Sequence, residues 1–224
     1  MTFLVTMPAV WDDVPRIDQM MPQRLDVAFF GMGCFLGSEP RFGVTKGVWR
    51  TTVGYAGGRC ESPSYDDTGD HIETVMIEYD PLVINYGQLL ELFLLRHYPS
   101  QKFSKPQHAS RIFVKNEFEK RLAQAALERY ELCSDASCHT RIAMCRNFYE
   151  AEKWCQKYFL RTFSWLMQEM TAFYPDEDNL IRSPLATRLN GILGQSTPSS
   201  SLPEDIEFYD LSEHTLQAIK QMLT

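Results

Sequence analysis

The fold of this 224-residue chain is decided by one stretch, Phe29-Phe30-Gly31-Met32-Gly33-Cys34-Phe35-Leu36-Gly37. The apolar residues 27–30 predict a buried strand, and residues 35–44 predict a helix. Glycines between them permit a tight turn, so Cys34 is expected at a helix N-terminus. Backbone N–H groups and the helix dipole there would lower the pKa of the thiol from its free value of roughly 8.5. These residues alone leave a nucleophilic thiol and a small buried hydrophobe equally open.

The rest of the chain alternates between strand-like and helix-like patterns. Apolar alternation predicts further strands at residues 48–55, 74–79, 111–114 and 140–145. Apolar residues at helical spacing predict helices at 86–96, 116–132 and 151–170. The pattern indicates an α/β (α+β) fold, a two-layer sandwich in which helices cover a mixed β-sheet.

The C-terminal part differs from the rest in composition. Residues 198–203, which are rich in proline and serine, predict a flexible connector. Ser212 is expected to cap a terminal helix, whose apolar stripe consists of Leu216, Ile219, Met222 and Leu223. We therefore expect three parts, an N-terminal extension over 1–25, a catalytic domain over 26–174 and a C-terminal helical extension over 175–224.

Composition excludes several classes of protein. A hydrophobic content of 44% is enough for one substantial core. The net charge of −7, with no dominant basic patch, argues against a nucleic-acid partner. No stretch approaches the ~18 apolar residues of a membrane span. Acidic residues among the first 21 predict that no targeting signal is present.

The six cysteines are expected to be free thiols. A chain of this size needs no disulfide staples, so we expect a reducing compartment and a cytoplasmic location. Cys133, Cys138 and Cys145 surround His139, which raises the possibility of zinc. Their spacing does not fit the common zinc patterns, and we expect no metal.

The motif at Cys34 resembles the Gly-Cys-Phe-Trp-Gly signature of the peptide methionine sulfoxide reductase A family. Further similarity follows in the family's order between residue 26 and about residue 163. The matching motifs are Gly47-Val48, Gly54-Tyr55-Ala56-Gly57-Gly58, Pro63-Ser64-Tyr65, Gly69-Asp70-His71-Ile72-Glu73, Tyr86-Gly87-Gln88-Leu89-Leu90 and Phe148-Tyr149-Glu150-Ala151-Glu152. Several motifs in one order are far more specific than a single one, so the chain is identified as a divergent member.

The resemblance implies a role for each of four residues. Cys34 would be the nucleophile, and Glu73 would donate a proton to the departing oxygen, with partial burial favouring its protonated form. Tyr65 would donate a hydrogen bond to the sulfoxide oxygen, and Phe35 would hold the methyl group. Taken alone, Glu73 would be interpreted as a solvated carboxylate and Tyr65 as a half-buried aromatic residue.

The chain departs from the family pattern at two places. Leu36 stands where the family has the tryptophan of the methyl seat, a loss of about 1–3 kcal/mol in transition-state binding if nothing refills the space. The loop between Gln101 and Ser110 is shorter and lacks the family's Gly-Asn-Asp-His-Gly-Thr-Gln-Tyr. His108 falls near the place of that tyrosine. It would either donate a hydrogen bond to the substrate oxygen or be an exposed loop histidine.

The thiol that regenerates Cys34 is not fixed by the sequence. In the family cycle a second cysteine condenses with the sulfenic acid, and thioredoxin reduces the disulfide. No cysteine follows Cys155, so the usual C-terminal resolving thiol is not recognisable. Cys60 and Cys155 are the internal candidates, and both could instead be structural. Without either, an external thiol such as glutathione or a glutaredoxin-like protein would reduce Cys34.

Two functions remain under consideration. The first is thiol-dependent reduction of methionine S-sulfoxide, free or in proteins, through a cysteine sulfenic acid, in protein repair and oxidative stress defence. It requires no cofactor beyond an external reductant such as thioredoxin, and we expect a monomer that binds neither nucleic acid nor membrane. The second is a catalytically weakened scaffold that acts as a binding or regulatory module through residues 175–224. Cys34, Tyr65 and Glu73 in one chain favour the enzyme.

Overall fold

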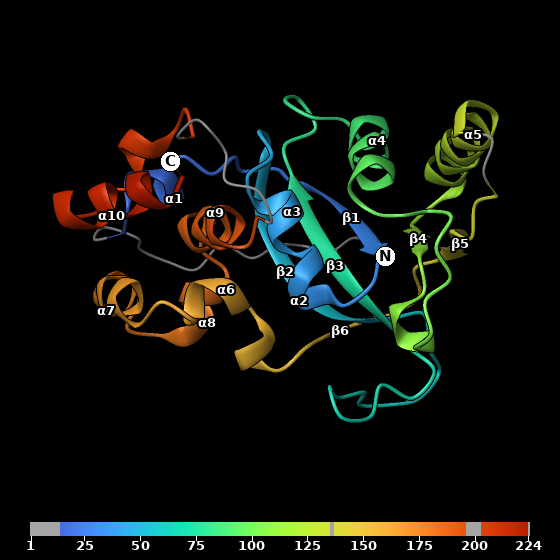
Figure 1. Ribbon diagram of the computed structural model, residues 1–224, viewed down its shortest axis with the longest axis horizontal. Helices are drawn as coiled ribbons and strands as arrows, with labels where there is room; N and C mark the ends of the chain where they lie inside the picture. Colours follow the sequence, from blue (N-terminus) through green and yellow to red (C-terminus); the bar gives the residue numbers. More distant parts are fainter. Residues whose placement is uncertain (1–13, 135–136, 196–202, 224) are drawn as a thin grey trace.

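The computed structural model describes residues 14–134, 137–195 and 203–223. A mixed six-stranded sheet with the order β5-β4-β1-β3-β2-β6 forms its centre (Figure 1). The strands are β1 (Asp26–Gly31), β2 (Val48–Ala56), β3 (Ile72–Tyr79), β4 (Arg111–Val114), β5 (Arg141–Met144) and β6 (Phe148–Glu150). The pairings are antiparallel except for β4 with β5, which is parallel. The sheet confirms the expected fold class.

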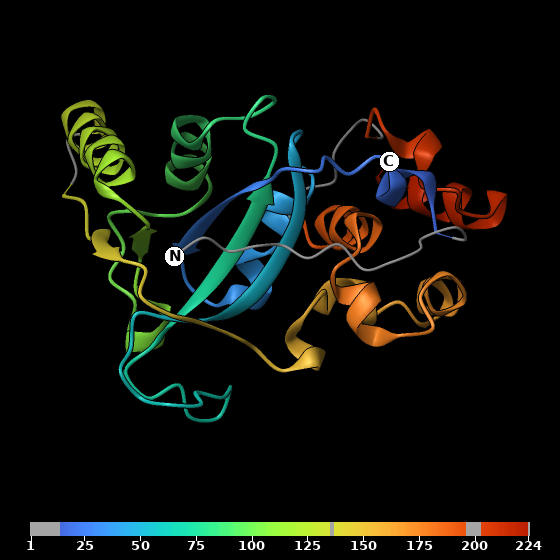
Figure 2. The ribbon, with the colours of Figure 1, turned by 180° about the vertical axis from the view of Figure 1, so that it is seen from behind.

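Helices form three groups around this sheet (Figures 1 and 2). Over its central strands lie α2 (Phe35–Ser38), α3 (Pro40–Gly43) and α9 (Pro184–Leu193). Beside β4 and β5 lie α4 (Tyr86–Arg96) and α5 (Glu117–Ser134). At the opposite end lie α1 (Arg16–Gln19), α6 (Tyr158–Arg161), α7 (Ser164–Phe173), α8 (Glu177–Ile181) and α10 (Glu213–Leu223). Short 3-10 turns are η1 (Pro106–His108), η2 (Lys153–Cys155) and η3 (Ile206–Phe208).

Local signals predicted some elements to the residue. The helix expected at 86–96 is α4, and the strand expected at 111–114 is β4. Asn85 and Gln88 form a capping box at the start of α4, in which each side chain accepts a hydrogen bond from the other's backbone amide. Strand β6, which pairs with β2, was not predicted because it is only three residues long.

Two segments that were each predicted to form one continuous helix are broken into shorter helices. Residues 35–44 form two helices of four residues each, because Pro40 begins α3 and has no N–H to continue the ladder of α2. Residues 151–170 are divided among η2, α6 and α7. The break lies at Lys157, which adopts a left-handed conformation with φ 55° after the extended Gln156.

The side chains gather in two main hydrophobic clusters. The central cluster joins the sheet to α2, α3, α4 and α5 and includes Phe30, Phe35, Tyr55, Ile77, Leu89 and Phe93. The second joins the N-terminal helix to the C-terminal helices and includes Ile17, Leu160, Leu166, Met170, Leu185, Leu189, Tyr209 and Ile219. The boundary proposed at residue 174 falls between α7 and α8, both of which contribute to this second cluster.

The predicted terminal helix is α10, and the Ser212 hydroxyl accepts a hydrogen bond from the Thr215 amide at 3.3 Å. Ile219 and Leu223 are buried as expected, but Met222 is 41% exposed and lies outside the buried stripe. Most of the proposed connector, residues 198–202, lies outside the described residues. In the described parts of the chain, no helix has both the length and the apolar character that a membrane span requires.

Candidate active site

Cys34 lies where β1 gives way to α2. Gly33 has a φ of 96°, a conformation that favours glycine, and it turns the chain so that Cys34 becomes the N-cap of α2. The Cys34 carbonyl accepts hydrogen bonds from the amides of Gly37 and Ser38, both at 3.2 Å. The half-buried side chain packs against the central hydrophobic cluster. The strand-to-helix position predicted for this thiol is confirmed.

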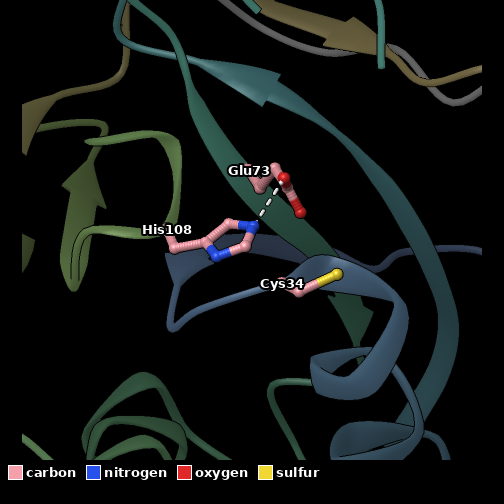
Figure 3. A group of neighbouring side chains, drawn as sticks. All are labelled: Cys34, Glu73 and His108. Atoms are coloured by element: carbon pink, nitrogen blue, oxygen red, sulfur yellow. Dashed lines mark hydrogen bonds and ion pairs between the residues drawn. The ribbon is translucent and has the colours of Figure 1, made fainter. Parts of the chain in front are cut away.

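Glu73, Cys34 and His108 converge from three different elements (Figure 3). Glu73 lies on β3 and is only 4% exposed. Its Oε2 accepts a hydrogen bond from the Phe35 amide at 2.9 Å, and its Oε1 lies 2.9 Å from Nε2 of His108 on η1. One ligand atom from each of the three side chains lies within 4.8 Å of the others. A thiol, a carboxyl group and an imidazole therefore share one small space.

The electrostatics of Cys34 overturn one expectation. Burial raises the pKa of the thiol above its usual value, and the negative charge of Glu73 raises it further. The amides of Leu36 and Gly37 act in the opposite direction, but α2 has only one turn and their effect is smaller. The prediction of a lowered pKa is therefore wrong, because it considered the helix terminus without the burial of the thiol and the adjacent carboxylate.

His108 is not an exposed loop histidine. Its side chain is mostly buried and contacts Glu73. His108 therefore belongs to the site through its contact with Glu73, a residue that the sequence had already assigned to the site. The local signal for this position is Pro106, which begins the turn that carries His108.

Aromatic rings line the open side of the site. Tyr65, which is 38% exposed, stacks on Phe35 at a centroid distance of 6.2 Å. The ring of Trp154, which is 47% exposed, meets Tyr65 edge-on at 4.8 Å. Leu36 is half-buried against the central cluster. Trp49 packs in the second cluster.

Glu152 fixes the loop that carries Tyr65, a role that the sequence did not indicate. Its Oε1 accepts a hydrogen bond from the Tyr65 amide and its Oε2 accepts one from the Tyr55 hydroxyl, both at 2.9 Å. Although burial opposes ionisation, these hydrogen bonds hold the pKa of Glu152 below its usual value. Glu152 ends the last of the motifs that match the family, Phe148-Tyr149-Glu150-Ala151-Glu152. That match was the sequence signal that could have pointed to a role for this residue.

The two candidate resolving thiols have different environments. Cys60 is exposed, and its amide donates to Asp70 at 3.2 Å. Cys155 is completely buried, with its sulfur 4.0 Å from Oε2 of Glu152. Burial raises the pKa of Cys155 to about 12, and the charges of Glu152, Glu73 and Cys34 add to this effect.

The cysteines weighed as zinc ligands do not form a metal-binding group. Within the described ranges, one group of three potential ligand residues occurs, and it consists of Cys34, Glu73 and His108. Cys133 is exposed at the end of α5, away from that group.

Comparisons with known proteins agree on one family. A sequence model described as "Peptide methionine sulfoxide reductase" matches residues 26–185. The chain is 44% identical over 168 residues to "Peptide methionine sulfoxide reductase" of Drosophila melanogaster, covering 74% of this chain and 67% of that protein. It is 40% identical over 180 residues to "Peptide methionine sulfoxide reductase A5" of Arabidopsis thaliana, covering 78% and 70%.

Solved structures show the same likeness. The reduced form of Mxr1 from Saccharomyces cerevisiae superposes with a TM-score of 0.57 at 26% identity, covering 64% of this chain and 88% of that one. Methionine sulfoxide reductase A of Corynebacterium diphtheriae superposes with a TM-score of 0.54 at 24% identity, covering 62% and 76%, and supports the fold.

Proposed function

The chain belongs to the peptide methionine sulfoxide reductase family, and we propose that it reduces methionine S-sulfoxide with Cys34 as the nucleophile. The observation that carries this proposal is the convergence of the Cys34 thiol, the Glu73 carboxyl group and the His108 imidazole within 4.8 Å. A sulfoxide needs a nucleophile at sulfur and a proton at oxygen, and this group contains both.

The reaction transfers one oxygen atom and two electrons. The Cys34 sulfur attacks the sulfoxide sulfur, the S–O bond of the substrate breaks, and the oxygen ends on Cys34 as a sulfenic acid. The products are methionine and Cys34–SOH, and one proton is consumed if the thiolate is the reactant. The substrate sulfur is thereby reduced while the Cys34 sulfur is oxidised.

Glu73 supplies the proton to the oxygen. Its carboxyl group lies beside the thiol and is held by the Phe35 amide and by His108. Because burial and the Glu73 carboxylate both raise the pKa of Cys34, the resting site keeps a proton on the thiol. That proton becomes available to Glu73, and through it to the sulfoxide oxygen, when Cys34 attacks. His108 orients the Glu73 carboxyl group during this transfer.

Tyr65 and its aromatic neighbours bind the substrate. The Tyr65 hydroxyl donates a hydrogen bond to the sulfoxide oxygen, while Phe35, Leu36 and Trp154 surround the methyl group. Both Tyr65 and Trp154 are partly exposed, which supports entry of a methionine sulfoxide side chain that is still attached to a peptide. Protein-bound and free methionine sulfoxide are both substrates under this proposal.

A second thiol returns Cys34 to its reduced form. Cys60 and Cys155 both stay internal candidates: Cys60 is exposed, whereas burial raises the pKa of Cys155 to about 12, which disfavours the thiolate that would attack the sulfenic acid. A thioredoxin or a glutaredoxin-like protein then supplies electrons, and no prosthetic group is required. Action as a monomer in the cytoplasm stays a prediction from the sequence.

The direct test is an assay of the purified full-length protein with labelled methionine S-sulfoxide and dithiothreitol. Wild type and Cys133→Ser, which removes an exposed thiol on α5, should produce methionine at the same rate. Cys34→Ser should produce none. Wild-type turnover in Cys34→Ser would remove Cys34 from the mechanism, and inactivity of the wild-type protein toward both sulfoxide epimers would favour the binding-module alternative.

A further inference from the structure

The three side chains at the candidate active site match the ligand set of a metal ion as well as that of a proton-transfer group. A cysteine sulfur, a histidine nitrogen and a carboxylate oxygen are the donors that Zn²⁺ binds in proteins. They come from the N-cap of α2, from η1 and from β3, so the site is assembled by the fold and not by one local segment. We propose that the reduced protein binds Zn²⁺ through Cys34, Glu73 and His108, and that the ion acts as a reversible inhibitor.

The distances between the three ligand atoms allow Zn²⁺ to bind if the side chains rotate. The ligand atoms lie within 4.8 Å of one another, and the Glu73–His108 pair is at 2.9 Å. Zn²⁺ takes sulfur at roughly 2.3 Å and nitrogen or oxygen at roughly 2.0–2.2 Å, so the ligands must close to roughly 3–4 Å from one another. Zn²⁺ would replace the hydrogen that now joins His108 to Glu73.

The surroundings of Glu73 favour a metal site. Its Oε2 is already fixed by the Phe35 amide and its Oε1 by His108, so the carboxyl group is held in place beside Cys34 (Figure 3). Such a hydrogen bond to a ligating carboxylate is the usual support of a protein metal site. With three protein ligands, the fourth tetrahedral position is open to water.

Zinc binding would stop the reductase reaction without damaging the thiol. The Cys34 thiol gives up its proton and its sulfur forms a bond to the ion, so no redox change occurs. The bound thiolate has its nucleophilic electron pair engaged, and Glu73 can no longer deliver a proton. Binding also protects the reduced sulfur from oxidation. The inhibitory consequence rests on the proposed function, whereas the binding itself does not.

Cobalt provides the test, because Co²⁺ bound to a thiolate absorbs light and Zn²⁺ does not. Reduced full-length protein, freed of thiol reductants without oxygen, is titrated with Co²⁺ and then with Zn²⁺. A sulfur-to-cobalt charge-transfer band with tetrahedral visible bands is expected, and stoichiometric Zn²⁺ should abolish both. His108→Gln keeps a hydrogen-bonding amide beside Glu73 but removes the imidazole, so affinity should fall by at least the roughly 10–100-fold typical of losing a supporting partner.

Two variants decide whether the band belongs to this site. Cys34→Ser is nearly isosteric and should lose the charge-transfer band, with folding checked by circular dichroism. Cys133→Ser combined with Cys138→Ser removes the competing thiols near His139 and should leave the band unchanged. A band that survives in Cys34→Ser, or one that disappears with the Cys133 and Cys138 thiols, would overturn the proposal.

Activity measurements separate the site from the proposed function. With a phosphine reductant that does not chelate strongly, Zn²⁺ should inhibit sulfoxide reduction, and EDTA should restore it. Active protein without a Cys34-dependent cobalt band would refute the metal site and leave the reductase function intact. Protein that binds Co²⁺ through Cys34 but reduces no sulfoxide would refute the function and leave the site.

Discussion

Two buried glutamates flank helix α2, and their hydrogen-bond partners differ. Glu39 is completely buried and fully paired. Its carboxylate accepts hydrogen bonds from Nζ of Lys157 at 2.6 Å, from the Thr51 hydroxyl at 2.9 Å and from the Asn190 amide at 3.1 Å. These partners come from β2, α9 and the turn before α6, so Glu39 joins the sheet to the helical end of the molecule.

Glu73 is almost as deeply buried but faces a reactive group. It has the Phe35 amide and His108 as partners, and it lies beside the Cys34 thiol. No cation equivalent to Lys157 is ion-paired with it among the described residues, apart from His108 when protonated. The contrast teaches that burial alone does not distinguish a structural carboxylate from a chemical one. The partners do, because a saturated carboxylate has no capacity left for a substrate proton.

The largest expected effect comes from neutralising Glu73. Glu73→Gln still offers a hydrogen bond to the sulfoxide oxygen but no proton, so kcat should fall by roughly 10²–10⁴-fold. Removing the negative charge should also lower the pKa of Cys34, because that charge raises it. The pH dependence of Cys34 alkylation, followed by mass spectrometry, should therefore shift to lower pH in the variant.

Glu39→Gln is the matched control for this comparison. It makes the same chemical change in an equally buried carboxylate, and it should lower stability while leaving kcat per folded molecule unchanged. Equal losses of kcat in both variants would show that burial of any carboxylate near α2 supports turnover, and the distinction drawn between Glu39 and Glu73 would fail.

The next effect concerns Lys157, the cation that is paired with Glu39. Lys157→Met leaves the Glu39 charge buried without its cation, which should reduce the free energy of unfolding by about 3–5 kcal/mol. Urea denaturation of the full chain measures this difference. In the double variant with Glu39→Gln much of the loss should return, because no unpaired charge then remains.

The ion pair between Lys157 and Glu39 is identified if the stability losses of the two single variants do not add in the double variant. If the double variant were destabilised by the sum of the two single losses, Lys157 and Glu39 would be acting independently, and the buried ion pair would not be the connection between the sheet and the helical end.

Asp18 provides a third buried carboxylate whose pH response can be worked out. Burial raises its pKa to about 6, despite hydrogen bonds from Tyr174, Leu185 and Ser183 that act in the opposite direction. Because the folded-state pKa lies above the unfolded value, the folded protein holds the proton more tightly. Stability should therefore be greatest below about pH 4 with respect to this group and fall by about 2–3 kcal/mol as the pH rises through about 6.

Thermal unfolding between pH 4 and 7 tests this expectation against Asp18→Asn. The asparagine variant cannot titrate, so the part of the pH dependence that belongs to Asp18 should vanish. An identical slope in both proteins would mean that Asp18 remains ionised throughout, and that its hydrogen bonds fully offset the cost of burial.

The sequence was most informative where the signal is local or part of a dense motif. The capping residues of α4 lie three positions apart, and the strand β4 is a compact apolar run. Cys34, Glu73 and Tyr65 were placed by motifs whose order is specific to the family. The meeting of Cys34 and Glu73 in space then follows from the antiparallel pairing of β1 with β3.

Long-range contacts explain what the sequence did not predict. The backbone turn at Lys157 ends a plausible helix because the Lys157 amide and side chain both bind Glu39, 118 positions away. The raised pKa of Cys34 comes from burial and from the charge of Glu73 on β3, and not from the neighbouring helix terminus alone. Helical periodicity and a local dipole cannot report either contact.

The smallest expected effect concerns the aromatic contact between Trp154 and Tyr65. The two rings meet edge-on with their centroids 4.8 Å apart. Such an aromatic pair contributes about 0.5–1.5 kcal/mol beyond its buried area, so Trp154→Ala should lower kcat/KM by roughly 2–10-fold through KM more than kcat. Steady-state kinetics with a peptide substrate measure the change.

Leu36→Trp decides whether Trp154 has taken over the role of the family tryptophan. If Trp154 already fills the seat, an added ring at position 36 should overpack the wild-type site, at a cost of about 1–3 kcal/mol in stability. In the Trp154→Ala background the same ring should instead restore kcat/KM. A gain of up to about 10–200-fold from Leu36→Trp in the otherwise unchanged protein would show a half-built seat. In that case Trp154 would belong to the surface of the molecule, and the open side of Glu73 would be lined by Phe35 and Tyr65 without it.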